Sequence, residues 1–136
     1  MTTDDIQFEP ATGDDLAELK SFLEPFMDDR LLLKRTSLEL ELLLRHGFKA
    51  VSQGAVVGFC ALEIYSKKLA EIQCLAVDPG FRRKGVARRL VTLCVERARD
   101  EKVKELMAIS SSDEMFMACG FDYSLPHQKR ALFIQP

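Results

Sequence analysis

The sequence predicts one α/β domain in which helices flank a mixed sheet, and three observations support this fold class. The chain has 136 residues, the usual length of one domain. Its 47% hydrophobic and 29% charged residues are typical of a globular protein with an ordinary core. Segments with helical and strand periodicity alternate along the chain, and residues 70–110 have the strand–helix–strand order of a parallel βαβ unit.

The N-terminal third is expected to hold one short strand and two helices. Residues 6–8 form the strand, which ends before a proline. Behind Gly13, apolar residues recur at helical spacing as far as residue 23, and 27–34 is a connection. Thr36 or Ser37 caps a second helix over 38–45, because Glu39 stands three residues after Thr36 and completes a capping box.

The remaining segments predict most of the sheet. Residues 48–52 and 55–65 form a hairpin that turns at Gln53-Gly54. A strand over 70–77 precedes a long amphipathic helix from Gly85 to about residue 100. A strand over 103–109, a short helix over 111–118 and a turn at Gly120-Phe121 complete the order.

Composition excludes several classes of protein. No apolar run reaches the ~20 residues of a membrane helix, and the acidic N-terminus lacks signal-peptide features, so a cytoplasmic protein without a membrane partner is expected. The stretch 80–104 holds nine bases and three acids, too short a block for a nucleic-acid footprint but suited to a compact anionic small molecule. The four cysteines show no metal or disulfide spacing and are expected in the core.

The loop that leads into the long helix carries the clearest chemical signal. It has the pattern Arg82-x-x-Gly85-x-Ala87, with Arg83, Lys84 and Arg88 beside it. A helix N-terminus presents unpaired main-chain N–H groups, and a glycine there lets an anion approach closely. Neither the P-loop nor the dinucleotide glycine pattern is present. Anion binding and a merely solvated basic helix start both remain open on this reasoning.

This pattern, after the strand that ends at Pro79 and with the later Cys119-Gly-Phe121, resembles the acetyl-CoA signature of the GNAT superfamily of N-acetyltransferases. The resemblance implies that residues 1–136 form one GNAT domain, with a twisted, mostly antiparallel sheet of about six to seven strands, splayed at the cofactor site, and about four helices. It also implies acetyl-CoA as co-substrate, no metal, and main-chain pairing of the pantetheine arm with the strand. The cofactor-binding residues would be Leu75, Ala76, Val77, Arg82, Arg83, Lys84, Gly85, Val86, Ala87 and Arg88.

A closer resemblance is to the acetyltransferase domains of N-acetylglutamate synthases, over residues 33–37, 71–79 and 116–121. It implies a small-molecule amine as acceptor, most simply an acidic amino acid such as glutamate. Arg35, with Lys34 as the close alternative, would hold the acceptor carboxylate. Ser111 stands where these enzymes often carry an arginine, a departure at the substrate-binding site.

Two residues are the candidate catalytic groups. Glu71 has apolar neighbours, which push the pKa of a carboxyl group upward and suit a general base, and its position resembles that of a base in several GNAT enzymes. Glu63 is the alternative base. The resemblance assigns the main-chain N–H of Leu75 to the thioester oxygen. Phe116 stands where many relatives have an acid tyrosine, and neither Tyr123 nor Cys119 is assigned this role.

Other functions stay open at this point. Acetylation of a protein N-terminus or a lysine is the alternative reaction, and a non-catalytic acyl-CoA-binding module is the alternative class. The glycine loop fits all of these, whereas Glu71 fits an enzyme better. No nucleic-acid partner is expected, and the sequence leaves a homodimer open.

Overall fold

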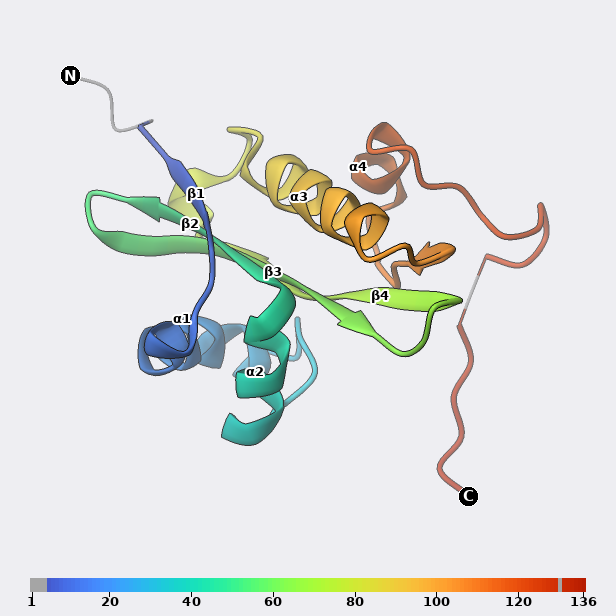
Figure 1. The fold of residues 1–136 in the computed structure, drawn as a ribbon, viewed down its shortest axis with the longest axis horizontal. Helices are drawn as coiled ribbons and strands as arrows, with labels where there is room; N and C mark the ends of the chain where they lie inside the picture. The colour runs from blue at the N-terminus through green and yellow to red at the C-terminus, as the bar shows by residue number, and fades with distance from the viewer. Residues whose placement is uncertain (1–4, 130) are drawn as a thin grey trace.

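The computed structural model describes residues 5–129 and 131–136, which form a five-stranded sheet with helices on both faces (Figure 1). The strands are β1 (Gln7–Pro10), β2 (Gly47–Ser52), β3 (Ala55–Ile64), β4 (Leu69–Val77) and β5 (Glu105–Met107). The helices are α1 (Leu16–Asp28), α2 (Ser37–Leu43), α3 (Val86–Asp100) and α4 (Asp113–Ala118), and three short 3₁₀ turns are η1 (Gly13–Asp15), η2 (Leu44–His46) and η3 (Pro79–Phe81). None of the described helices is long and apolar enough to cross a membrane.

The helices form one layer on each side of the sheet. Figure 1 shows α1 and α2 against one face and α3 with α4 against the other. Leu19, Leu23 and Leu40 join the core on the α1–α2 side, and Leu90 and Cys94 join the core on the α3 side. The apolar stripes that predicted amphipathic helices are therefore the surfaces that these helices bury.

The sheet is mixed, and β4 pairs with its parallel neighbour β5 over only part of its length. Strands β1 to β4 are antiparallel neighbours in chain order, and β5 joins β4 in parallel after the crossover through α3. The parallel pairing covers only Leu69–Glu71 of β4 and Glu105–Met107 of β5. Beyond Glu71 the two strands separate, which is the splayed sheet that the GNAT resemblance implies.

Two local sequence signals are confirmed in atomic detail. Thr36 caps α2: its Oγ1 accepts from the Glu39 N–H at 3.1 Å, and Glu39 Oε1 accepts from the Thr36 N–H at 2.8 Å. The hairpin turns at Gln53 and Gly54, whose φ values of 50° and 78° both lie in the left-handed region. A two-residue turn of this type matches the twist of the strands that it joins.

The expected strand number was too high, since the described part of the chain holds five strands rather than six to seven. The described residues after α4 form turns and irregular structure and add no strand to the sheet. Leu132, Phe133 and Ile134 are 89%, 83% and 86% exposed, so they do not bury against the sheet as strand residues would. Strand β5 is also shorter than the expected 103–109.

Candidate active site

Strand β4 carries a β-bulge near the point where it leaves β5. Its register with β3 is regular as far as Gln73 and resumes at Ala76 with one extra residue on β4. Within the bulge, Cys74 has a φ of 57°. A bulge bends a strand and redirects its side chains. Gln73 and Cys74 consequently both face the α1–α2 layer, whereas Leu75 packs on the α3 side.

One edge of β4 is unpaired beside this bulge. The part of β4 after Glu71 has no strand partner on the edge away from β3, among the residues that the structure describes. Free main-chain groups on such an edge can pair with an extended ligand in the manner of an added strand. Leu75, Ala76 and Val77, predicted to bind the cofactor, lie in this stretch. Their predicted roles are main-chain roles, which are compatible with side chains that pack into the two cores.

The predicted anion loop leads from β4 into α3. Gly85 is the residue before the first turn of α3, and its φ of 79° is a conformation that glycine adopts readily. A Cβ built at Gly85 meets no atom within 4 Å, so the space in front of the helix is open. The helix has no side-chain cap, and Arg82, Arg83 and Lys84 are exposed beside it. This arrangement fits a phosphate group.

The next three residues predicted to bind the cofactor, Val86, Ala87 and Arg88, differ in how deeply they are buried. Val86 is buried against the sheet and Ala87 is half-buried, so these two residues offer main-chain N–H groups rather than side chains to an anion. Arg88 is exposed, and its Nη2 lies 3.4 Å from the carbonyl oxygen of Ala118. That contact links the start of α3 to the end of α4.

A chain of polar side chains crosses β3 and β4 on the α1–α2 face. Glu63 and Glu71 are direct partners on the two strands. The Tyr65 hydroxyl lies 2.6 Å from Glu71 Oε1 and 3.3 Å from Glu63 Oε1. Gln73 donates through Nε2 to Glu63 Oε1 at 3.1 Å, and its Oε1 accepts from Arg35 Nη2 at 2.6 Å. We call these five residues the polar network, and it joins both candidate bases to the candidate carboxylate-binding arginine.

The network contains an unfavourable pair of like charges. Carboxylates directly opposite each other on neighbouring strands repel, and the donors placed between Glu63 and Glu71 offset part of this repulsion. Partial burial, with the hydrogen bond and charge of Glu71, raises the pKa of Tyr65 to about 12. The Tyr65 phenol therefore remains protonated, and remains a donor, well above neutral pH.

The three predicted acceptor-binding residues have different environments. Arg35 is half-buried and its Nε is buried with no hydrogen-bond partner among the described residues, whereas Lys34 is exposed. The guanidinium also lies near Cys74: burial raises the pKa of that thiol to about 11, and Arg35 opposes the rise. Ser111 is exposed in the turn before α4. Of the two basic candidates, Arg35 is the one that contacts β4.

The residues around α4 provide no general acid that the structure singles out. Phe116 is buried, with its ring edge-to-face against Phe121 at a centroid distance of 5.3 Å, so it is a core residue. The Tyr123 hydroxyl donates to Asp113. Cys119 Sγ lies 3.9 Å from a main-chain carbonyl of α3. These contacts give Tyr123 and Cys119 structural roles, so neither residue is assigned as the general acid.

The apolar sequence contexts predicted all four cysteines in the core, and three of them are fully buried there. Cys60, Cys74 and Cys94 are buried free thiols, and Cys119 is half-buried. Cys60 and Cys94 meet between β3 and α3 with their sulfur atoms 3.6 Å apart. In the part of the chain that the structure describes, no three His, Cys, Asp or Glu side chains are grouped to hold a metal ion.

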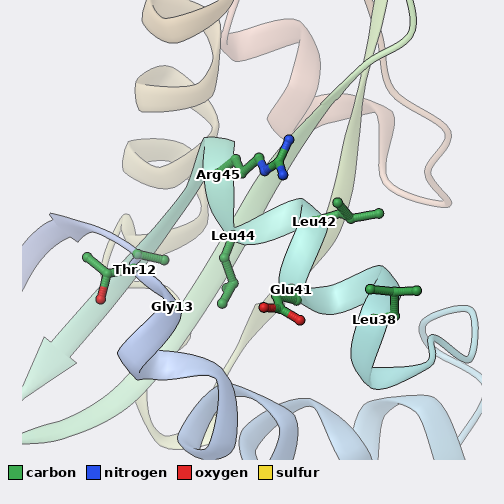
Figure 2. Close-up of a pocket in the computed structure, with 8 residues that line it drawn as sticks. Thr12, Gly13, Leu38, Glu41, Leu42, Leu44 and Arg45 are labelled. Carbon is green, nitrogen blue, oxygen red and sulfur yellow. The ribbon is translucent and has the colours of Figure 1, made fainter.

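Two pockets lie away from the predicted site residues. One, of about 380 Å³, lies between α2 and the turn at Thr12 and Gly13 (Figure 2), and Glu41 and Arg45 are the charged residues that line it. The other, of about 700 Å³, lies between β5, α4 and the C-terminal segment. Neither is lined by the polar network or by the loop at 82–88. The candidate site is therefore defined by a strand edge, a helix start and the polar network.

Tyr65 and Gln73 are two network residues that sequence reasoning missed. The available signal was the spacing of two between Glu63 and Tyr65 and between Glu71 and Gln73, which places each pair on one face of its strand. This spacing does not say that the two faces coincide, because that depends on the register of β3 against β4.

Three features of the candidate site lie in one continuous region formed by β3, β4 and α3: an unpaired strand edge, a helix start with open space before it, and titratable side chains beside a bulge. Residues 14–121 match the Acetyltransferase (GNAT) family. The chain belongs to this family, whose enzymes take their acetyl group from acetyl-CoA.

Individual relatives agree with this assignment. An N-acetyltransferase of Chlorobaculum tepidum, described as uncharacterized, is 32% identical over 107 residues, covering 79% of this chain and 69% of the relative. The amino-acid acetyltransferase of Aeromonas salmonicida is 26% identical over 133 residues, which are 93% of this chain and 30% of the relative. This chain therefore spans less than a third of that enzyme's length.

A solved structure shows the same fold. It is N-acetylglutamate synthase from Neisseria gonorrhoeae, complexed with coenzyme A and N-acetyl-glutamate, with a TM-score of 0.73 and 24% identity. The match covers 83% of this chain and 27% of that chain. The expected mixed α/β GNAT fold and the resemblance to this group of enzymes are confirmed.

Proposed function

We propose that this acetyltransferase acetylates the α-amine of an amino acid, with a small acidic amino acid such as glutamate as acceptor. The observation that carries the proposal is the polar network, which joins a guanidinium at one end to two carboxylates at the other. A zwitterionic amino acid has the complementary pair of groups, a carboxylate and an ammonium. Relatives described as amino-acid acetyltransferases, and a neighbour complexed with N-acetyl-glutamate, support the same acceptor class.

Arg35 would bind the acceptor carboxylate. Its guanidinium is hydrogen-bonded to the neutral Gln73 amide rather than to a carboxylate, with the Glu39 charge nearby, and its Nε is a buried donor without a described partner. A guanidinium presents donors in a planar fork that matches a carboxylate. Lys34, exposed next to Arg35 in the chain, and Ser111, exposed before α4, are the further predicted contacts to the acceptor.

Glu71 would act as the general base. An amine must be neutral to attack a thioester, so the acceptor ammonium first gives a proton to the Glu71 carboxylate, directly or through one water. The neutral nitrogen then forms a bond to the acetyl carbon while the carbon–sulfur bond breaks, and the departing thiolate of coenzyme A takes up the second proton, which the nitrogen loses as it becomes an amide. The Leu75 main-chain N–H would stabilise the negative charge on the carbonyl oxygen.

The donor substrate would lie along β4 and the start of α3. Leu75, Ala76 and Val77 would pair with its extended arm, and the N–H groups after Gly85 would hold its pyrophosphate. The open space at Gly85 and the exposed bases at 82–84 support this placement. The strand edge leads directly along the chain into the candidate anion loop. One extended molecule with a pantetheine arm and a pyrophosphate, such as acetyl-CoA, would therefore contact both.

The test is release of coenzyme A thiol from acetyl-CoA, with product identified by mass, against a panel of acceptors. The panel contains glutamate, glutamine, isoglutamine, leucine and a lysine peptide. Glutamine keeps only the α-carboxylate and isoglutamine only the side-chain carboxylate, so together they show which carboxylate is required. We expect acetylation of glutamate in preference to leucine, and activity restricted to the peptide would overturn the proposal.

A further inference from the structure

Gln73 lies between two opposite charges, and the acetyl-transfer mechanism proposed above gives it no role. Its Oε1 accepts from Arg35 Nη2 at 2.6 Å and its Nε2 donates to Glu63 Oε1 at 3.1 Å. The two contacts fix the orientation of the amide, because a guanidinium offers only donors and a carboxylate only acceptors. One side-chain amide therefore separates Arg35 from Glu63.

Without this amide the two charged groups would pair with each other. Arginine has a long, flexible side chain, and a guanidinium–carboxylate pair in a partly buried place is strongly favoured once both groups are present. Such a pair would occupy the donors of Arg35 and compensate its charge. A neutral amide instead satisfies one donor of Arg35 and one acceptor of Glu63 and leaves both formal charges in place.

The β4 bulge places Gln73 in this position. The regular register of β4 ends at Gln73, and the extra residue keeps Cys74 on the same face of the sheet, where it fills the buried space beneath Arg35. Gln73 is half-buried between the two strands and the connection that carries Arg35. Its hydrogen bonds thus join β4 to two other segments, β3 and the connection before α2.

We propose that Gln73 is a positioning residue that holds Arg35 apart from Glu63 and thereby sets the preference of the acceptor site for a carboxylate. This inference rests on the proposed function for the group that Arg35 binds. Gln73 touches neither reacting atom in this scheme; it acts through Arg35. Its identity, an uncharged side chain with one donor end and one acceptor end, is what the role requires.

The first test replaces the amide by an unbranched apolar side chain. In Gln73→Met, Arg35 is expected to pair with Glu63, so KM for glutamate should rise at least tenfold while kcat and KM for acetyl-CoA stay within about threefold. Adding Glu63→Gln removes the competing charge and should restore KM for glutamate at least partly. Glu63→Gln alone is the control. A residue that only supported the fold would not be rescued by this second substitution.

The second test adds a charge without changing the shape. Gln73→Glu places a carboxylate against Arg35. The ratio of kcat/KM for glutamate to kcat/KM for its carboxamide, glutamine or isoglutamine, should therefore fall at least tenfold for the one whose missing carboxylate Arg35 binds. Glu63→Gln should not rescue this variant, because the compensating charge now lies on residue 73. Equal rescue of the Met and Glu variants would overturn the inference.

A crystal structure of Gln73→Met gives a readout that needs no acceptor. We expect an Arg35–Glu63 nitrogen–oxygen distance within 4 Å; Arg35 left in its present place, with KM unchanged, would overturn the inference. If the wild-type protein acetylated no amino acid while Arg35 still moved onto Glu63 in the variant, the proposed function would fail and the positioning role would stand. If the wild-type protein preferred carboxylates and Gln73→Met kept that preference, the proposed function would stand and the positioning role of Gln73 would fail.

Discussion

Two carboxylates face each other across β3 and β4, and their hydrogen-bond partners distinguish them. Glu71 accepts the shorter contact from Tyr65, at 2.6 Å, whereas Glu63 is 3.3 Å from the same hydroxyl and also accepts from Gln73. Glu63 is therefore connected, through Gln73, to Arg35. Glu71 accepts from Tyr65 and lies beside the point where the pairing of β4 with β5 ends, which is why we propose Glu71 rather than Glu63 as the base.

Glu71→Gln should lower kcat by about 10²–10⁴, the usual contribution of a general base, without changing the affinity for acetyl-CoA. The defect should shrink as the pH rises, because more of the acceptor amine is then neutral without help. Steady-state kinetics between pH 6 and pH 9.5 measure both effects. Glu63→Gln is the matched control, and a larger loss of kcat in that variant would transfer the role of base to Glu63.

Arg35→Ala should raise KM for glutamate at least tenfold and leave KM for acetyl-CoA unchanged. The reason is the loss of a charge-assisted contact in a partly desolvated place, which costs about 2–5 kcal/mol in comparable sites. Arg35→Lys should recover the affinity only in part, because an ammonium lacks the planar fork. Lys34→Ala, at an exposed neighbour, is the control. Unchanged KM values in Arg35→Ala would mean that another group binds the acceptor.

At the scale of a single element, we propose the start of α3 as the binding site for the pyrophosphate of the donor. Acetyl-CoA at about 100 times its Kd should stabilise the protein by roughly 2.7 kcal/mol if it binds only the folded state. Gly85→Val should remove most of this stabilisation, because a branched side chain would fill the open space before the helix. Thermal unfolding with and without acetyl-CoA measures the difference.

The hairpin turn supplies a control for the backbone strain in that variant. Gly54 has a φ of 78°, close to the 79° of Gly85, and a Cβ built there also meets no atom within 4 Å. Gly54→Val should therefore cost similar folding stability and keep the full response to acetyl-CoA. A full response in Gly85→Val as well would show that the pyrophosphate does not bind at this helix start.

At the scale of the whole molecule, a buried ion pair ties the α1–α2 layer to the sheet. Lys49 on β2 lies 2.7 Å from Asp15, the residue before α1, and the two side chains are only 17% and 12% exposed. Burial raises the pKa of Asp15, but hydrogen bonds from Lys49 and Thr12 outweigh it and hold that pKa below its usual value. The pair therefore stabilises the fold above about pH 3.8 and loses this contribution as the pH falls through the lower, folded-state pKa of Asp15.

Lys49→Met should lower the free energy of unfolding at pH 7 by about 1.5–3 kcal/mol, the range for hydrogen bonds to charged groups. The deficit relative to wild type should begin to shrink as the pH falls below about 3.8 toward the folded-state pKa of Asp15, because a protonated carboxyl group no longer pairs with Lys49. Urea unfolding at pH 7 and pH 3 provides the comparison. Arg89→Met is the control, because the Arg89–Glu96 pair is half exposed, with its atoms 3.8 Å apart, and should contribute little. A deficit independent of pH would argue for lost packing instead.

Most of the element order could be predicted from the sequence, because its signals are local. Thr36 with Glu39 marks a helix start within four residues, and Gln53-Gly54 marks a hairpin within two. The expected number of strands was too high because it came from the family resemblance; the five strands predicted from local periodicity are the five that the described residues form.

The sequence by itself determined the family and located the candidate anion loop, since Arg82-x-x-Gly85-x-Ala87 is a short contiguous pattern that depends on one helix start and one positive φ. Tertiary structure alone decided the polar network. Arg35 and Gln73 are 38 residues apart, and they meet because the β4 bulge and the β3–β4 register turn one face of the sheet toward the α1–α2 connection. Strand register is a property of packed pairs of strands, and a shift of one residue would have turned Gln73 to the opposite face.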